Sequence, residues 1–191
     1  CIHKAFGDPF DLAVAAFRER RKKEYTAKFV PIDCKDYRES GHTYTGVYEI
    51  YPFGTTLPPI RVYCDMDTLA GGWTAIQKRI DGSLTFDKKW DDYKNGFGAT
   101  EQNLWIGDRM LDTGDLNTNL SEMSFSTLDR DHDRCGWCNC AVDHGGGWWY
   151  NGCHDANLNG KWSPEEWWEP WYPPLKNGSD ITETLIMIRR H

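Results

Sequence analysis

Seven cysteines constrain this chain of 191 residues more than any other feature. Structural cysteines persist as disulfides in oxidising compartments and are rare in proteins of the reducing cytosol. Four of them fall between residues 135 and 153, where Cys135, Cys138 and Cys140 precede a Gly- and Trp-rich loop that ends at Cys153-His154. This usage indicates a disulfide framework in a secreted, extracellular protein.

The same cluster also suggests a zinc site. A C-x-x-C pair with a further Cys or His can close a tetrahedral Zn²⁺ site. Zinc patterns usually contain a second well-spaced ligand pair, whereas here the partner is the single dipeptide Cys153-His154 within a loop. We therefore favour disulfides over zinc.

Charge and hydropathy argue against two large classes of protein. The chain has 22 Lys and Arg against 29 Asp and Glu, a formal net charge of −7, so we expect no nucleic-acid partner. No run of about eighteen apolar residues occurs, so we expect no membrane span. Asn119 and Asn177 are candidate glycosylation sites that agree with secretion. Since the chain begins at Cys1 without a signal peptide, we take it as a mature or trimmed segment.

Residues 1–30 differ from the rest. Asp8 can cap a helix with Pro9 at its first position, and Phe10, Val14 and Phe17 recur at helical spacing before a basic run. This pattern predicts one amphipathic helix of about four turns. The helix is either the end of an oligomerising stalk, which would make the protein a homo-oligomer, or a helix packed on its own domain, and the sequence leaves both open.

From Cys34 onward, short runs of β-forming residues alternate with turns. The runs 45–51, 60–64 and 71–79 predict successive strands of an antiparallel sheet, and 184–189 predicts a last strand. Aromatic residues at helical spacing predict a helix over 86–94. Beyond Gly107 we expect mostly loop until the last strand, and loops this long in a compact domain need disulfides or a metal to hold them.

Three carboxylates, Asp129, Asp131 and Asp133, stand two residues apart. In a looping backbone this spacing turns alternate side chains to one side, as Ca²⁺ ligands require. The chain does not match an EF-hand, because Arg134 stands where Gly is required and Cys140 where a bidentate Glu is required. Two interpretations remain: a Ca²⁺ site completed by carbonyls of the following loop, and an acidic surface loop with neighbouring arginines as partial counter-charges.

Several short motifs follow one another along residues 32–191. They are Gly71-Gly72-Trp73-Thr74, Gly96-Phe97-Gly98, Met123-Ser124-Phe125-Ser126-Thr127, the run Asp129 to Asp133, Asn139-Cys140-Ala141, Gly146-Gly147-Trp148-Trp149-Tyr150, Cys153-His154 and Asn157-Leu158-Asn159-Gly160. In this order they resemble the fibrinogen C-terminal-like domain family, which includes the ficolin and tachylectin-like lectins. The resemblance implies an α+β fold with a mainly antiparallel central sheet, short helices, and long loops held by disulfides and a calcium site. It assigns residues 31–191 to the domain and leaves 1–30 as an N-terminal helical segment.

The resemblance also implies specific sites. Two disulfides are implied, Cys34–Cys64 and Cys140–Cys153. A calcium site is implied with the side chains of Asp131 and Asp133 and carbonyls near Cys135 and Trp137 as ligands.

Lectins of this family hold an acetyl group in a pocket beside the metal loop. In them the peptide before the last cysteine is cis, so that two backbone N–H groups point at the acetyl oxygen, and that peptide here is Gly152-Cys153. His154 is expected to contact the ligand, with His144 facing it. Trp167 or Trp168 are the nearest candidates for an aromatic wall. We expect packing roles for Trp73, Trp90, Trp148 and Trp149.

Three features depart from the family pattern. Leu104-Trp105-Ile106-Gly107 is followed almost at once by Asp115, so the central region is shortened or a segment is absent. Cys135 and Cys138 lie inside the calcium loop, where they can pair with each other or one can pair with Cys1. The region after Gly160 is compressed and acidic, so ligand preference does not carry over directly.

Function follows from these sites. No nucleophile with a positioned base is recognisable, so we expect no enzyme. The leading hypothesis is a calcium-dependent lectin that binds acetylated sugars in innate immunity. The alternatives are a receptor-binding or matrix-type ligand, with exposed carboxylates such as Asp143 or Glu166 beside the same loop, and a structural polymer subunit.

Overall fold

The computed structural model describes residues 29–107, 123–154, 156–162 and 183–191. The chain divides into two compact units, Cys1–Val30 and Pro31–His191, and almost all described residues belong to the second. Several predictions therefore lie outside the described residues and stay predictions: the helix from Asp8, the pairing of Cys1, glycosylation at Asn119 and Asn177, and the aromatic wall at Trp167 and Trp168.

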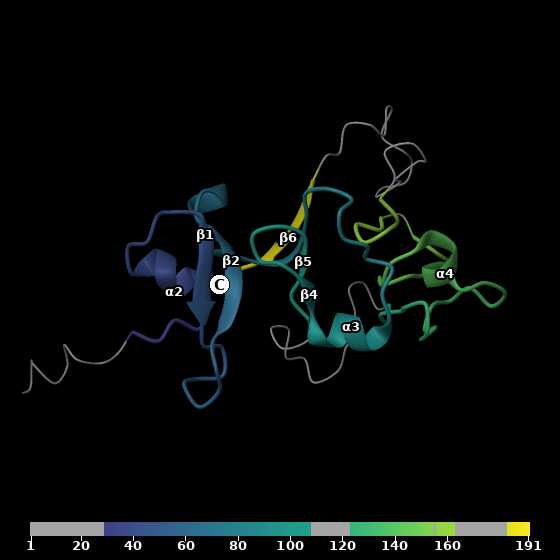
Figure 1. The fold of residues 1–191 in the computed structure, drawn as a ribbon, viewed down its shortest axis with the longest axis horizontal. Helices are drawn as coiled ribbons and strands as arrows, with labels where there is room; N and C mark the ends of the chain where they lie inside the picture. The colour runs from purple at the N-terminus through teal and green to yellow at the C-terminus, as the bar shows by residue number, and fades with distance from the viewer. Residues whose placement is uncertain (1–28, 108–122, 155, 163–182) are drawn as a thin grey trace, which may run out of the picture. The chain divides into compact units, whose positions relative to one another are not determined.

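An antiparallel sheet of six strands forms the centre of the second unit (Figure 1). The strands are β1 (Gly46–Ile50), β2 (Ile60–Asp65), β3 (Trp73–Arg79), β4 (Phe97–Gly98), β5 (Leu104–Trp105) and β6 (Thr184–Ile188). They lie in the order β1-β2-β3-β5-β4, and β6 pairs with β3. The predicted α+β class with a mainly antiparallel sheet is confirmed.

Strand β3 is the hub of this sheet. Its first residues pair with β2, at Cys64↔Thr74, and its later residues pair with β5, at Lys78↔Leu104. Strand β6 runs along its other edge from Thr74↔Ile188 to Arg79↔Thr184. The end of the chain, yellow in Figure 1, therefore completes a sheet that begins with β1.

Within the described residues, three short α-helices and one 3-10 turn accompany the sheet. They are α2 (Cys34–Glu39), η1 (Thr68–Ala70), α3 (Trp90–Asn95) and α4 (Cys140–His144). The helix predicted over 86–94 begins instead at Trp90, because the backbone N–H of Lys89 donates to the carboxylate of Asp92 and fixes the start there. Helix α4 lies in the region that was predicted to be mostly loop. Its start is set by one residue, Asn139, whose side chain accepts from the N–H of Val142.

The core of the described residues has three clusters. One is aromatic and contains Phe86, Trp90, Tyr93, Trp105 and Phe125. The second surrounds Cys34 and Cys64 with Ile50, Val62 and Met66. The third contains Cys140, Ala141 and Tyr150, with Cys135, Cys138, Trp148 and Cys153 packed against it. Each of the last two clusters therefore contains disulfide-bonded cysteines.

Three of the four predicted packing roles for tryptophan are confirmed. Trp90 is buried, and the half-buried Trp149 and Trp148 pack against the aromatic and the third cluster. Trp73 is also half-buried but lies outside the three clusters. The indole N–H of Trp73 donates to the Thr68 carbonyl and the guanidinium of Arg189 lies over its ring, so this indole stays near the surface. Among the tryptophans that the structure describes, the most buried is Trp105, 1% exposed.

Candidate functional site

Three disulfides hold the described part of the domain. Cys34–Cys64 and Cys140–Cys153, the two pairs that the family resemblance implies, are both present. The third bond joins Cys135 to Cys138. Of the alternatives that the sequence left open for these two cysteines, the structure contains the pairing within C-x-x-C.

The acidic loop, residues 129–134, contacts the segment before it through His132. Between Asp131 and Asp133, the backbone N–H of His132 donates to Ser126 Oγ over 2.9 Å, and its Nδ1 lies 2.9 Å from the carbonyl oxygen of Phe125. Asp131 is exposed, and its Oδ1 accepts the N–H of Asp133 over 3.1 Å. His132 thus connects the acidic loop to Phe125 and Ser126, and a carboxylate precedes and follows it in the sequence.

The third carboxylate of the cluster, Asp129, has a different role. Its Oδ1 accepts the N–H of Trp90, the first residue of α3, over 2.9 Å and the hydroxyl of Thr127 over 2.8 Å. Partial burial raises the pKa of Asp129, but these hydrogen bonds outweigh it and leave the pKa below its ordinary value. Asp129 therefore anchors α3 to this loop.

Asp133 binds both sides of the cysteine-rich loop. Its Oδ1 accepts the N–H of Cys135 over 2.7 Å, and its Oδ2 accepts the N–H of Cys140 over 2.8 Å. Each carboxylate oxygen has two acceptor sites, so one N–H bond leaves room for a cation. Oxygen ligands of this kind suit Ca²⁺, which takes six to eight of them.

Two carboxylates alone do not complete such a shell. In the part of the chain that the structure describes, the only close group of three or more His, Cys, Asp or Glu is Cys138, Cys140 and Cys153. Carbonyl oxygens of the following loop would therefore have to supply the remaining ligands. That loop carries Cys135 and Trp137, and the Trp137 side chain is 91% exposed.

The predicted ligand residues that the structure describes lie in residues 144–154. His144 is the last residue of α4, and its ring meets that of His154 edge to face, with centroids 4.7 Å apart. The ring of Tyr150 lies 5.9 Å from His154. The peptide between Gly152 and Cys153 is cis, as the family resemblance implies.

The acidic loop is joined directly to residues 144–154, which carry the predicted ligand residues and are called the ligand loop. The N–H of Arg134 donates to the carbonyl of Asn151 over 2.8 Å, and the N–H of Asn151 donates to the carbonyl of Cys153 over 2.7 Å. The Cys140–Cys153 disulfide makes a second connection between the start of α4 and the ligand loop. The positions of the two loops are therefore linked by hydrogen bonds and by a disulfide bond.

A buried polar cluster supports the ligand loop from the side of β3, and sequence reasoning gave it no role. It consists of Gln77, Arg79, Asn157 and Asn159, which are all at most 1% exposed. Asn157 Nδ2 donates to Tyr150 Oη over 2.8 Å, and Asn159 Nδ2 donates to the Gly147 carbonyl over 2.9 Å.

Strand β3 supplies the other half of this cluster. Gln77 Nε2 donates to Asn159 Oδ1, and the guanidinium of Arg79 donates to the carbonyls of Leu158 and Gly160 over 3.1 and 2.6 Å. Burial lowers the pKa of Arg79 to about 10, so the guanidinium still carries its charge at neutral pH. The Asn157 to Gly160 motif was the available signal, but its partners on β3 lie about 80 residues earlier.

Comparison with known proteins identifies the family. The profile of the C-terminal globular domain of fibrinogen beta and gamma chains matches residues 30–115 and 107–170. The chain belongs to the fibrinogen C-terminal domain family. The match is split into two stretches that meet at residues 107–115, where the sequence departs from the family pattern.

Individual members of the family are similar at a moderate level. Human angiopoietin-2 is 30% identical over 82% of this chain, which spans 42% of that protein. The fibrinogen-like globe domain of human ANGPTL2 has a TM-score of 0.70 at 28% identity, covering 83% of this chain and 98% of that domain. Lamprey fibrin D-dimer, solved with the peptide Gly-His-Arg-Pro-amide, has a TM-score of 0.60 at 22% identity, with 80% and 72% coverage. The chain thus spans less than half the length of the curated angiopoietin relative.

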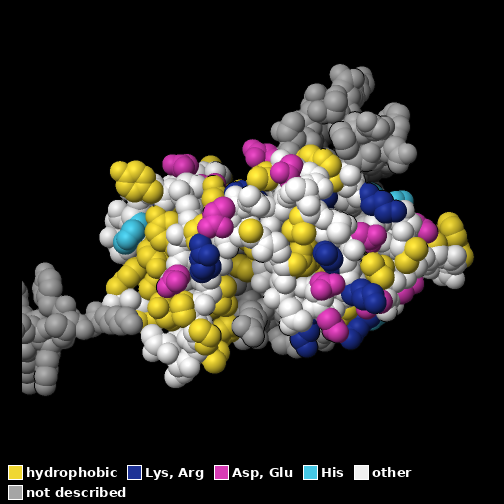
Figure 2. All heavy atoms as spheres, in the orientation of Figure 1, with side chains coloured by type: hydrophobic (Ala, Val, Ile, Leu, Met, Phe, Trp, Pro, Cys, Tyr) yellow, Lys and Arg dark blue, Asp and Glu magenta, His cyan; other side chains and the backbone are white. Residues whose placement is uncertain are grey.

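The surface of the described residues carries both charged and apolar side chains. On the face drawn in Figure 2, acidic and basic side chains lie interspersed among apolar ones. Across the described segments, no helix is long and apolar enough to cross a membrane.

Proposed function

We propose that this chain is a secreted, calcium-dependent recognition domain that binds acetylated carbohydrate at the ligand loop, residues 144–154. Three disulfides support secretion, because such bonds persist outside the reducing cytosol. Membership of a family of binding domains supports a recognition role and not an enzymatic one.

The paired imidazoles of His144 and His154 carry this proposal. Their ring nitrogens can donate to, or accept from, a sugar hydroxyl or an acetyl carbonyl, and the ring faces suit an acetyl methyl. Both rings sit on backbone that is fixed by the Cys140–Cys153 bond and by the link from Arg134 to Asn151. A ligand would therefore meet positions that are already ordered.

Retention on a sugar-bearing polymer tests the proposal. The full chain, in calcium, should bind a polymer bearing N-acetylglucosamine and not the same polymer bearing glucosamine. Single-site affinity of lectins is low, so a multivalent surface is needed, and a homo-oligomer formed through residues 1–30 would supply several copies. His144→Ala should weaken binding about tenfold, the equivalent of one lost hydrogen bond of about 1.4 kcal/mol.

His191→Ala is the matched control for this experiment, because His191 is also exposed but lies at the end of the chain, after β6. It should leave retention unchanged. Equal retention on both polymers, or none in calcium, would remove the acetylated sugar from this account.

Calcium binding is a separate proposal, with Asp131 and Asp133 as side-chain ligands and the carbonyls of Cys135 and Trp137 as further ligands. An ion present at 100 times its dissociation constant stabilises the folded state by about 2.7 kcal/mol, which raises Tm by roughly 5–10 °C for a domain of this size. Asp131→Asn should abolish this shift while leaving Tm in chelator unchanged, because the Asp131 side chain is exposed. Thermal unfolding followed by circular dichroism measures both.

The control for calcium is Asp143→Asn, an exposed carboxylate on α4 outside the acidic loop. This variant should keep the full calcium-dependent rise in Tm. If Asp131→Asn keeps the rise as well, the acidic loop is not the site.

A protein partner is the second candidate function. Its support is the exposed Trp137, together with the exposed Val142 and Asp143 that follow it, because aromatic side chains on a fixed loop often dominate protein interfaces. In that case Trp137→Ala, and not His144→Ala, should abolish binding to intact cells. Prior protease treatment of the cells should remove the binding, and glycosidase treatment should spare it.

A further inference from the structure

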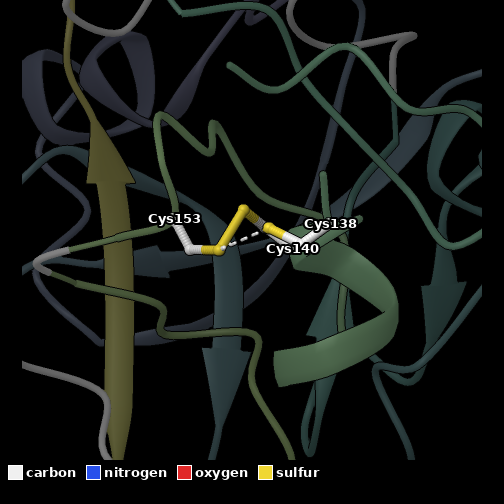
Figure 3. Close-up of side chains that lie close together, drawn as sticks. All are labelled: Cys138, Cys140 and Cys153. Atoms are coloured by element: carbon white, nitrogen blue, oxygen red, sulfur yellow. Dashed lines mark hydrogen bonds between the residues drawn. A yellow bond between two sulfur atoms is a disulfide. The ribbon is translucent and has the colours of Figure 1, made fainter. Parts of the chain in front are cut away.

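Four sulfur atoms lie close together between the acidic loop and the ligand loop. They belong to the outer disulfide, Cys135–Cys138, and to the inner disulfide, Cys140–Cys153. Figure 3 shows that Cys138 of the outer bond approaches the inner bond, with its Sγ 3.9 Å from Sγ of Cys153. The sulfurs of Cys138, Cys140 and Cys153 all lie within 4.8 Å of one another. One disulfide therefore has a sulfur in contact with the next.

The two bonds differ in how a reductant can reach them. Cys135 and Cys138 are half-buried, and the two residues between them, Gly136 and Trp137, are exposed. Cys140 is fully buried, at 0% exposure. Cys153 is half-buried, so the inner bond is shielded at Cys140 only, whereas both cysteines of the outer bond are half-buried residues of a surface loop. A reductant from solvent can therefore approach either sulfur of the outer bond, but only the Cys153 sulfur of the inner one.

Three cysteines this close can also bind a soft metal ion, but only as thiolates. In the structure all three are already in disulfides, so the chemistry available to them is exchange of sulfur partners. Disulfide exchange proceeds when a thiolate attacks a disulfide sulfur and the other sulfur leaves as a thiolate.

We propose that Cys135, Cys138, Cys140 and Cys153 form a redox-modification site in which reduction of the outer bond leads to exchange of the inner one. A dithiol reductant supplies two electrons and two protons, cleaves Cys135–Cys138 and leaves as its own disulfide. The Cys138 thiolate then attacks Sγ of Cys153, forms a Cys138–Cys153 bond and releases Cys140 as a thiolate that takes up a proton. The second step consumes no further reductant.

The exchange changes what holds the ligand loop. In the oxidised protein Cys153 is bonded to the first residue of α4, Cys140, whose N–H donates to Asp133 Oδ2. After exchange Cys153 is bonded to Cys138 on the surface loop, and the first residue of α4 has lost its disulfide bond to the ligand loop. Redox state would thereby alter both the ligand loop and the support of the acidic loop.

Limited reduction followed by thiol trapping tests the site in the intact protein. The full chain is exposed to dithiothreitol without denaturant, quenched in acid at intervals and alkylated. Chymotrypsin cleavage after Trp137 and at Trp148 to Tyr150 separates Cys135, the Cys138–Cys140 segment and Cys153. Fragmentation of the linked peptides then shows which cysteine is bonded to Cys153.

The expected result is a growing population with a Cys138–Cys153 bond and alkyl groups on Cys135 and Cys140. Its rate should rise about tenfold per pH unit below pH 8, because the thiolate is the attacking species and the pKa of a free cysteine is about 8.5. Alkylation of Cys135 and Cys138 with the Cys140–Cys153 bond intact at every time point would overturn the proposal.

Two matched variants separate this proximity effect from general disulfide scrambling. Cys135→Ser leaves Cys138 unpaired beside Cys153, so its Cys140 should be alkylated without any reductant. Cys138→Ser leaves Cys135 unpaired, which is not part of the close sulfur group, so its Cys140–Cys153 bond should stay intact. Alkylation of Cys140 to the same extent in both variants, or in neither, would contradict the assignment.

Discussion

Replacing Trp105 by Ala should destabilise the domain by about 3–5 kcal/mol, the usual cost of truncating a fully buried tryptophan. Trp105 is 1% exposed, and its indole N–H donates to the Tyr93 carbonyl over 2.9 Å. Its ring also contacts those of Tyr93 and Phe125, with centroids 5.2 and 5.9 Å apart. The substitution opens a cavity in the aromatic cluster and leaves a buried carbonyl without its donor.

Urea unfolding with the disulfides intact measures this effect. The matched control is Trp137→Ala, since Trp137 is 91% exposed and should change stability by less than about 0.5 kcal/mol. Tm should fall by roughly 6–20 °C in the Trp105 variant and stay nearly constant in the control. Similar losses in the two variants would show that Trp105 is not the core residue described here.

Replacing Arg79 by Met should cost about 2–4 kcal/mol and loosen the ligand loop. Arg79 is 1% exposed, and its guanidinium donates to the carbonyls of Leu158 and Gly160. The apolar side chain of Met offers these carbonyls no donor. Each unsatisfied buried carbonyl costs about 1–3 kcal/mol, part of which is offset because a charge is no longer buried.

Hydrogen exchange distinguishes this local effect from a general loss of stability. Amide protection in residues 145–160 should fall more than protection in β1 and β2. Arg61→Met is the control, because the Arg61–Glu101 ion pair spans 2.8 Å at the surface, with both side chains more than half exposed, and such pairs contribute about 0–1 kcal/mol. Uniform loss of protection across the sheet in the Arg79 variant would mean that this residue does not act on the loop specifically.

Local sequence patterns were sufficient to predict the four longer strands. The alternation in 45–51, 60–64, 71–79 and 184–189 predicted β1, β2, β3 and β6, since side chains that alternate between the two faces of a sheet leave a period of two in the sequence. Strands β4 and β5 have two residues each, too few to show a period. The six-residue α2 and five-residue α4 were missed for the same reason.

In the candidate site, too, the sequence indicated contacts within one loop but not contacts between distant segments. Asp131 and Asp133, which the spacing singled out, each accept the backbone N–H two residues later, a contact that the local backbone geometry sets. Asp129 has the same spacing, yet it bonds to α3, about 40 residues earlier in the chain. Spacing alone could not separate the three carboxylates, because a tertiary contact decides the role of one of them.

The seven cysteines indicated by themselves that disulfides hold this chain, because oxidising compartments preserve such bonds and long loops need them. The family motifs then implied two of the pairs. Only the tertiary structure brought Cys138 within 3.9 Å of Cys153 and placed Arg79 against Gly160, at the end of the Asn157 to Gly160 segment that supports the ligand loop. Those contacts join residues that are 15 and about 80 positions apart, and no local preference of the chain encodes such a distance.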